Sequence, residues 1–158
     1  MQTSLPQTTA PSPEERLMAA IAHAMIIVYM IGIIGPLVIW ITQKHKSRYV
    51  AFQALQALTY QLLVLVIYFF GFACYFCGIF SLVFGGAFID SRIPGTVNLD
   101  MVMTLPVLIM LFLLFFMLAS IIYGLVGAVI VLLGKDFRYF LIAPLLESYL
   151  ARAAQTAP

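Results

Sequence analysis

Long stretches without charge alternate with short polar segments along this chain. Asp, Glu, Lys and Arg are absent from residues 17–43, 49–89 and 101–134. Each of these stretches is long enough for a membrane-spanning helix, which needs about 20 predominantly apolar residues. The pattern therefore predicts an all-α fold, a polytopic transmembrane helical bundle of about three spans. The predicted spans are about residues 17–41, 58–89 and 101–133, with a turn expected at Pro94 and Gly95, Pro106 tolerated near the start of the third span as an early-turn or kink residue, and Gly134 as its C-terminal stop.

The first helix is predicted to begin at about Pro13. Ser12 can act as the N-cap, Pro13 suits the first helical position, and Glu15 stands where a capping box requires an acid. The preceding residues are mostly polar and have almost nothing to bury, so we expect a disordered tail. The predicted organisation is a tail at residues 1–12, a transmembrane helical domain at 13–143, and an amphipathic segment and tail at 144–158.

The first apolar run contains a break signal at Gly35 and Pro36. Proline removes a backbone donor and clashes with the preceding turn, so we expect a kink there. The alternative is a re-entrant hairpin broken at the same two residues. A hairpin would move the N-terminal tail to the opposite side of the membrane. The sequence therefore leaves the first element open between a single kinked span and a hairpin.

The second long stretch begins with a stripe of polar side chains. Gln53, Gln56 and Tyr60 recur at spacings of three and four, so they share a helical face, and Gln61 lies beside them. Amide groups at the entry to a span need hydrogen-bond partners that lipid cannot supply. We expect them to bond across the bundle or to face headgroups. The alternative is a polar groove offered to a partner or to a translocating segment.

Two further features of the apolar stretches could carry chemistry. His23 is an ionisable group inside the first run, where such groups are functional suspects, although a neutral imidazole bonded to a neighbouring helix explains it structurally. Cys74 and Cys77 form a C-x-x-C pair without the further ligands that zinc requires, and we interpret them as small packing residues. No cofactor is expected, because a bis-His haem needs a second ligand at membrane depth and His45 lies in a basic loop.

The distribution of basic residues predicts the orientation of the chain. Positive charges gather after the first and third predicted spans, whereas the middle loop has Arg92 alone. The positive-inside rule then places both basic regions in the cytoplasm, in a multi-pass protein of the cell inner (cytoplasmic) membrane. The amphipathic stretch from Pro144 is expected to lie on the membrane rather than to cross it. The topology-setting residues are Lys44, Lys46, Arg48, Lys135 and Arg138.

Composition narrows the range of possible functions. Only 9% of the residues are charged and 64% are hydrophobic, with a mean hydropathy of +1.09. Soluble domains have about 25% charged and roughly 45–50% apolar residues, so a water-soluble fold is not expected. The net charge is +2, and no Lys/Arg-rich patch lies beyond residues 44–48, so nucleic-acid binding is not expected either. The expected partners are the lipid bilayer and other membrane proteins or a second copy of the chain.

Residues 14–61 and 124–146 carry a set of recognisable motifs. They are an acidic-basic start, an Ala-His pair, a Gly-Pro-led apolar run that ends in Trp, an amphipathic polar segment and a Gly-basic-aromatic exit from the last span. The residues concerned are Glu15, Arg16, Ala22, His23, Gly35, Pro36, Trp40, Phe52, Gln56, Ala57, Leu58, Gln61, Gly134, Arg138 and Tyr139. Together they resemble a widespread prokaryotic membrane family of unknown function, related to the Tic-twenty component of the chloroplast inner-envelope import machinery. The chain departs from that pattern at Gln53 and Thr59, where His and Asn are frequent, and at Phe140, where Pro is usual.

Enzymatic activity is not expected, because the sequence has no Gly-rich phosphate loop, Ser/His/Asp set or pair of intramembrane carboxylates. The interpretation we favour is a small integral membrane protein that acts as an accessory or scaffold subunit and associates with other membrane proteins. Small residues in its spans would allow the close packing that such association needs. The resemblance suggests the alternative, a Tic-twenty-like transport or protein-translocation element. A membrane thiol redox protein that uses Cys74 and Cys77 is a distant alternative.

Overall fold

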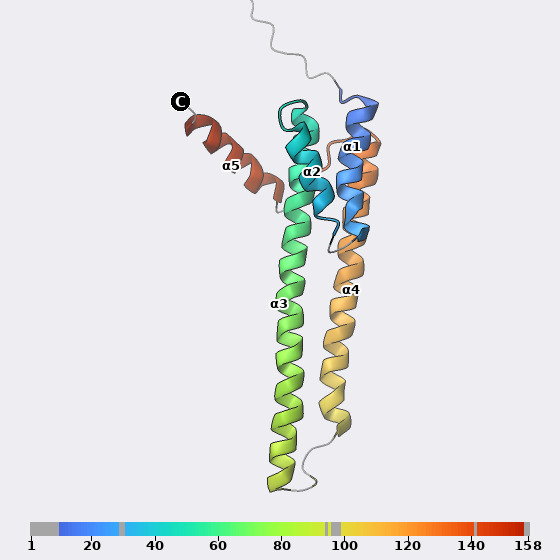
Figure 1. Cartoon of the computed structure of the whole chain (residues 1–158). Helices are drawn as coiled ribbons and strands as arrows, with labels where there is room; N and C mark the ends of the chain where they lie inside the picture. Colours follow the sequence, from blue (N-terminus) through green and yellow to red (C-terminus); the bar gives the residue numbers. More distant parts are fainter. Residues whose placement is uncertain (1–9, 29–30, 94, 96–98, 141, 157–158) are drawn as a thin grey trace, which may run out of the picture. The chain divides into compact units, whose positions relative to one another are not determined.

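The protein is all-helical over the residues that its structure, a computed structural model, describes: 10–28, 31–93, 95, 99–140 and 142–156 (Figure 1). In chain order the elements are α1 (Pro13–Ala24), the 3₁₀ helix η1 (Met25–Val28), α2 (Ile34–Gln43), α3 (Arg48–Arg92), α4 (Leu99–Leu132) and α5 (Ile142–Thr156). The predicted helical class is thus confirmed. The chain divides into two compact units, residues 1–62 with 121–158 (unit 1) and residues 63–120 (unit 2).

The start of α1 follows the capping signals in the sequence. The Ser12 side chain accepts a hydrogen bond from the Glu15 backbone at 3.2 Å, and the Glu15 carboxylate accepts one from the Ser12 backbone at 2.8 Å. The predicted capping box and first helical residue, Pro13, are confirmed. Hydrogen bonds from the Ser47 side chain and the Ser12 backbone lower the pKa of Glu15, which keeps a negative charge at the positive end of the helix. The predicted disordered tail lies largely outside the described residues.

The first apolar run does not form one long helix. Regular helix ends at Ala24 and resumes only at Ile34, so the break precedes Gly35 and Pro36 rather than falling at them. Both residues lie in the first turn of α2, where a missing proline N–H costs nothing because first-turn N–H groups have no intrahelical partner.

Helices α1 and α2 pack side by side as an antiparallel pair, which we call the α1–α2 hairpin (residues 13–43) (Figure 1). Near the turn, a Cβ added to Gly35 would lie only 2.6 Å from Met25 Cγ, so the two segments approach closely there. At the open end, the Gln43 amide donates to Met18 Sδ at 3.3 Å. These two contacts show that the chain reverses direction between them.

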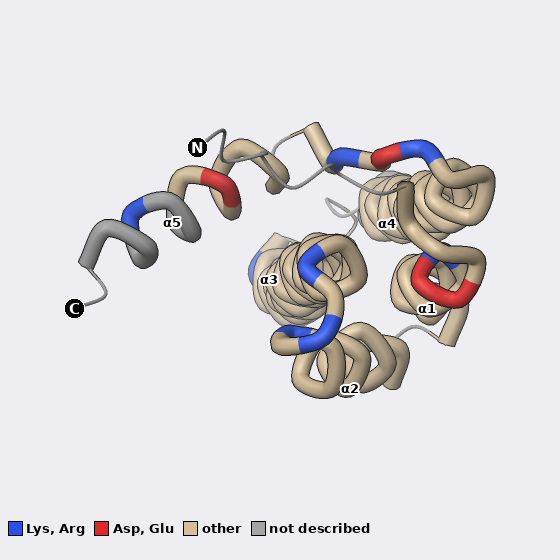
Figure 2. The backbone as a smooth tube through the Cα atoms, turned by 90° about the horizontal axis from the view of Figure 1, so that it is seen from above, with Lys and Arg blue, Asp and Glu red and all other residues tan. Residues whose placement is uncertain are grey.

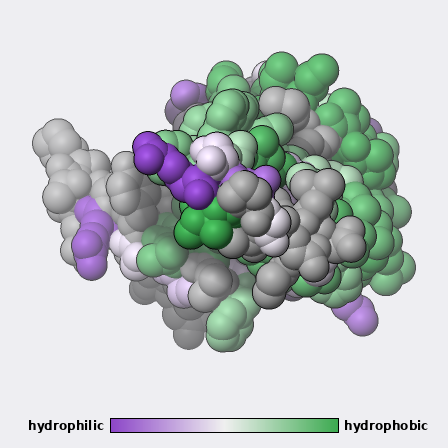
Figure 3. All heavy atoms as spheres, turned by 90° about the horizontal axis from the view of Figure 1, so that it is seen from below, coloured by the Kyte–Doolittle hydropathy of each residue, from purple (hydrophilic) through white to green (hydrophobic). Residues whose placement is uncertain are grey.

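Two helices of the described chain are long and apolar enough to cross a membrane: Arg48–Arg92 and Met103–Leu132. The predicted count of three spans is therefore not confirmed. Only 11% of the most apolar window of each helix is buried within the protein. Hydrophobic residues cover much of the coloured surface in Figure 3, with a few hydrophilic ones among them. Apolar side chains that face outward over such lengths are typical of contact with lipid.

Within unit 2, α3 and α4 contact each other through a few residues. The Tyr68 hydroxyl donates to the Leu113 carbonyl at 2.8 Å, and Gly71 lies close to the Leu113 side chain. Pro106 stands inside α4, as expected from its position near the helix start. The turn predicted at Pro94 and Gly95 is described only at Gly95, whose backbone has φ of 79° and donates to the Asp90 carboxylate at 2.8 Å.

The end of α4 depends on a glycine. Gly134 has φ of 79°, a conformation that glycine adopts without steric cost, so its predicted role as the helix stop is confirmed. A Cβ at this position would lie 2.6 Å from the Arg16 guanidinium. Arg16 therefore covers the C-terminal end of α4, where a positive charge is favourable.

The core of unit 1 is built on small residues of α1. Ala19 and Ala20 pack against α4 and the segment that follows it, and Ala22 packs against Ala54 and Ala57 of α3. The absence of long side chains on this face of α1 allows the neighbouring backbones to come close. The other members of the larger cluster are Val131, Phe137, Tyr139 and Ile142.

Substitution of Gly35 tests the close approach within the hairpin. Gly35→Ala is expected to lower the free energy of unfolding by about 1–3 kcal/mol, because the added methyl group collides with Met25. The measurement is the thermal midpoint of the helical circular-dichroism signal in detergent. Gly78→Ala is the matched control, since a Cβ there meets nothing within 4 Å and alanine favours the helix. Equal midpoints for the two variants would contradict the packing described.

Candidate functional site

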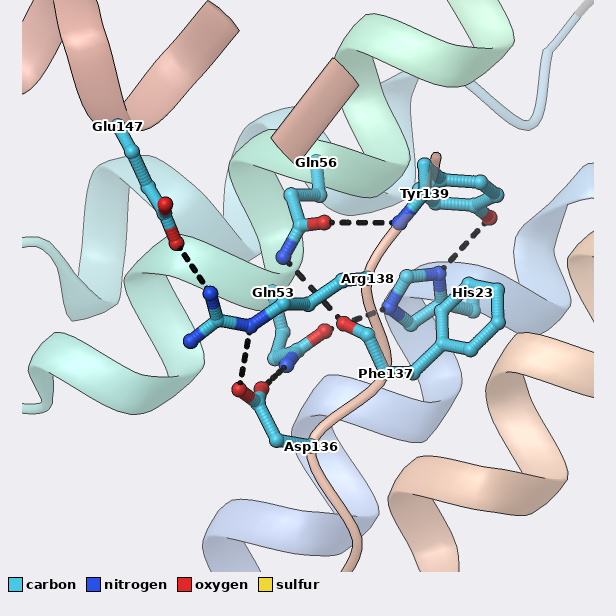
Figure 4. A network of polar contacts seen from close by, with 8 residues as sticks. All are labelled: His23, Gln53, Gln56, Asp136, Phe137, Arg138, Tyr139 and Glu147. Carbon is cyan, nitrogen blue, oxygen red and sulfur yellow. Dashed lines mark hydrogen bonds and ion pairs between the residues drawn. The ribbon is translucent and has the colours of Figure 1, made fainter. Parts of the chain in front are cut away.

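The predicted polar residues gather in unit 1 around the segment that follows α4, residues 133–140, which we call the exit segment (Figure 4). Gln53 and Gln56 on α3 have no exposed surface, His23 on α1 is 1% exposed, and Gln61 is 6% exposed. Groups of this kind are costly to bury unless each finds a hydrogen-bond partner. Their partners therefore decide what this part of the fold does.

A directed chain of hydrogen bonds runs through His23. The Tyr139 hydroxyl lies 3.0 Å from Nδ1 of His23, Nε2 lies 3.2 Å from Oε1 of Gln53, and the Gln53 amide donates to Asp136 at 2.7 Å (Figure 4). The Asp136 carboxylate can only accept, so Gln53 must direct its NH₂ to Asp136 and its oxygen to His23. His23 then carries its proton on Nε2, and Tyr139 donates to the bare Nδ1.

Gln56 binds the backbone of the exit segment from both ends of its amide. Its oxygen accepts from the Tyr139 N–H at 3.2 Å, and its NH₂ donates to the Phe137 carbonyl at 3.5 Å (Figure 4). This pairing satisfies two main-chain groups of a non-helical segment that has no ladder of its own. The Gln56 amide thus supplies the two hydrogen bonds that a neighbouring backbone segment would otherwise supply.

Gln61 acts at the other end of α1. Its amide donates at 3.3 Å to the carbonyl of Ala22, in the last turn of the helix, where carbonyls lack intrahelical partners. Its side-chain oxygen is buried without a partner among the described residues. Gln53 and Gln61 together therefore hold α1 against α3 through one side chain and one carbonyl of α1.

Aromatic rings close the site on the side of α4. The ring of Tyr60 stacks on that of Tyr139 with centroids 4.3 Å apart, and Tyr123 meets both rings edge to face. Phe137 stands edge-on to the His23 ring at 5.6 Å. Burial, and after it the phenols of Tyr60 and Tyr123, raise the pKa of Tyr139 above its ordinary value. Tyr139 therefore stays protonated and keeps its hydrogen bond to His23.

The polar cluster reaches the surface at Asp136. Arg138 donates to Asp136 at 2.8 Å and to Glu147 of α5 at 2.7 Å, and all three side chains are about half exposed (Figure 4). Exposed pairs of this kind contribute little stability because water and salt screen them. The Arg138–Glu147 pair joins α5 to the exit segment.

The residues predicted to set the topology lie at one end of unit 1. Figure 2 shows basic residues between α2 and α3 and again directly after α4, beside the charged start of α1. Lys44, Lys46 and Arg48 are exposed, and the Lys44 ammonium lies 5.7 Å from the centre of the Trp40 ring. This end of unit 1 is a charged rim on an otherwise apolar exterior.

Sequence reasoning did not identify the partners of the buried amides. Asp136 and the backbone of Phe137 were not among the predicted site residues, and Tyr139 was noted only as part of an aromatic exit. The available signal was that amides within a span need partners and that the polar residues nearest the last span lie in residues 135–139. That signal indicates residues 135–139 as the partner segment, but it does not indicate which amide bonds to which residue.

Cys74 and Cys77 do not pack inside the chain. Both thiols are reduced and exposed on α3, so their interpretation as small packing residues is not supported within a single chain. Among the described residues, no group of three or more His, Cys, Asp and Glu side chains is placed to hold a metal ion. The site as observed is a hydrogen-bonded tie between α1, α3 and the exit segment.

Replacement of Gln53 tests this tie. Gln53→Leu is expected to lower the free energy of unfolding by about 1–3 kcal/mol, because the buried Nε2–H of His23 loses its acceptor. The readout is the thermal midpoint in detergent. Thr59→Val on the same helix is the control, since the Thr59 hydroxyl bonds only to its own helix at Leu55. A Gln53→Leu midpoint no lower than that of the control would disprove the role of the tie.

Comparison with known proteins identifies the family. A family model described as the magnetosome magnetite crystal formation protein family (MamF/MmsF) matches residues 14–146. No curated protein and no solved structure matches the chain, and no link to the Tic-twenty component is shown. The expected prokaryotic, membrane-associated family is confirmed in this coarser form. Since the match covers far more than half of the 158 residues, the chain belongs to the magnetosome magnetite crystal formation protein family.

Proposed function

We propose that this chain is an integral protein of the magnetosome membrane that acts as an accessory or scaffold subunit in the formation of magnetite crystals. The observation that carries the proposal is the family match over residues 14–146. Two long apolar helices with little internal burial support a membrane location. Other membrane proteins or further copies of the chain would be its partners.

A structural rather than an enzymatic role is supported by the state of the polar site. The amide oxygen and the NH₂ group of both Gln53 and Gln56 are hydrogen-bonded within the chain, and the His23 ring is bonded at both nitrogens. Groups that satisfy one another in this way fix a conformation. The same burial does not support the translocation alternative, because Gln53 and Gln56 have no exposed surface to offer to a translocating segment.

The orientation we propose places the charged rim of unit 1 in the cytoplasm. Helices α3 and α4 would cross the bilayer, and the α1–α2 hairpin would enter and leave on the cytoplasmic side. The basic residues after α2 and after α4 support this arrangement through the positive-inside rule. The hairpin alternative from the sequence thus replaces the single kinked span.

Replacement of the resident family member in a magnetite-forming bacterium tests the function. Cells that lack their own copy and express this chain are expected to regain the normal distribution of crystal size, measured by electron microscopy. A Gln53→Leu/Gln56→Leu double variant is expected to fail, because the exit segment loses its attachment to α3.

Thr59→Val serves as the control and is expected to restore the crystals as the unmodified chain does. Immunoblots of the membrane fraction establish that all chains are present at similar levels. The proposal is wrong if the unmodified chain reaches the magnetosome membrane at normal levels and the crystals still resemble those of the deletion strain.

A further inference from the structure

The α1–α2 hairpin does not reach across a bilayer. Helix α1 has 12 residues, η1 has four and α2 has 10. At 1.5 Å per α-helical residue and 2.0 Å per 3₁₀ residue, the first arm extends about 26 Å and α2 about 15 Å, whereas the hydrocarbon core is about 30 Å thick. Helices α3 and α4, with 45 and 34 residues, are long enough to pass through both leaflets. The number of helices therefore differs between the two leaflets.

Both ends of the hairpin lie at charged positions, and its turn is apolar. Glu14, Glu15 and Arg16 stand at its start, and the basic residues 44–48 follow its end. At the turn, Ile31 and Ile34 are 64% and 53% exposed. This arrangement suits a hairpin whose open end lies among headgroups and whose turn lies in hydrocarbon.

The described backbone of the turn, residues 31–35, is compatible with an apolar environment. The Ile34 N–H donates to the Ile31 carbonyl at 3.0 Å, and the Gly35 N–H donates to the Gly32 carbonyl at 3.1 Å. Backbone groups without such partners would cost several kcal/mol each in lipid. The outward side chains of the hairpin are also suited to lipid, as they include Leu17, Ile21, Ile27, Val28, Val38 and Ile41.

Helix α5 adds to the same leaflet. Its first residues, Ile142 and Ala143, are buried in unit 1 and anchor its start, and Arg138 pairs with Glu147 at the surface. Leu145 is 68% exposed, whereas the exposed Glu147 lies two residues further along the helix. An apolar side and a charged side on one helix are typical of a helix that lies in the membrane interface.

We propose that this protein partitions into curved membrane in which the leaflet that holds the basic loops is the convex one. The physical reason is that the α1–α2 hairpin and α5 add area to that leaflet, whereas among the described elements only α3 and α4 extend into the other leaflet. Insertion into one leaflet relieves the excess area that this leaflet has on the convex side of a bend, and such binding is sensitive to curvature. The ligand of this surface is the bilayer itself. The inference rests on the hairpin and is independent of any role in crystal formation.

Membrane tubes pulled from giant vesicles test the inference. The full chain would carry a single cysteine, His45→Cys, in a Cys74→Ser/Cys77→Ser background. Labelling after reconstitution with a membrane-impermeant fluorescent maleimide makes visible only the molecules whose basic loop faces outward. The readout is protein fluorescence per lipid fluorescence in the tube divided by the same ratio in the vesicle. This quotient is expected to exceed one and to rise as the tube narrows.

Two variants connect the effect to its cause. Ile31→Asp/Ile34→Asp draws the turn toward water and is expected to lower the quotient, whereas Ile31→Val/Ile34→Val is the matched control and should leave it unchanged. Leu145→Glu weakens only the contact of α5 with lipid and should lower the quotient in part. This variant provides the test of the proposal if the Ile31→Asp/Ile34→Asp variant does not fold. A quotient of one or less for the unmodified chain at every tube radius would overturn the proposal. So would a folded Asp variant that sorts like its control.

Discussion

The cost of burying amide and imidazole groups in an apolar protein organises this fold. Gln53 and Gln56 have no exposed surface, and a surrounding bilayer offers their amides no partners. They are satisfied only if α1, α3 and the exit segment meet, although these segments are about 30 and 80 residues apart in the chain. Apolar contacts alone would specify this arrangement poorly, because lipid tails are as apolar as the side chains. Hydrogen bonds supply the specificity.

The sequence predicted the features that depend on neighbouring residues. The capping box at Ser12, the stop at Gly134 and the stripe of Gln53, Gln56 and Tyr60 on one helical face all follow from local spacing. The pairing of Gln53 with Asp136 did not follow from spacing, because it joins residues from distant segments. Local sequence patterns indicate that a buried amide needs a hydrogen-bond partner. Only the three-dimensional structure shows which residue that partner is.

The path of the first apolar run was also beyond the sequence pattern. A kinked span and a hairpin have the same composition, since both place apolar side chains against lipid. The structure favours the hairpin because the small alanine face of α1 fits closely against α3 and α4, and because Gln61 satisfies the carbonyl end of α1 at Ala22. A regular helix that continued past Ala24 would already have a partner for the Ala22 carbonyl, four residues further along. The hairpin and the buried polar site therefore depend on each other.

The central claim, that α1 and α2 enter and leave on one side, is tested most directly by cysteine accessibility in bacterial cells that form no magnetosomes, with the chain inserted in the inner membrane. Single cysteines would replace Ala10 before α1, His45 after α2 and Ser91 near the end of α3, in a chain without Cys74 and Cys77. An impermeant maleimide added to intact cells is expected to label only the cysteine at position 91, with positions 10 and 45 labelled together after permeabilisation. Labelling of position 10 but not position 45 in intact cells would show a single crossing and contradict the account.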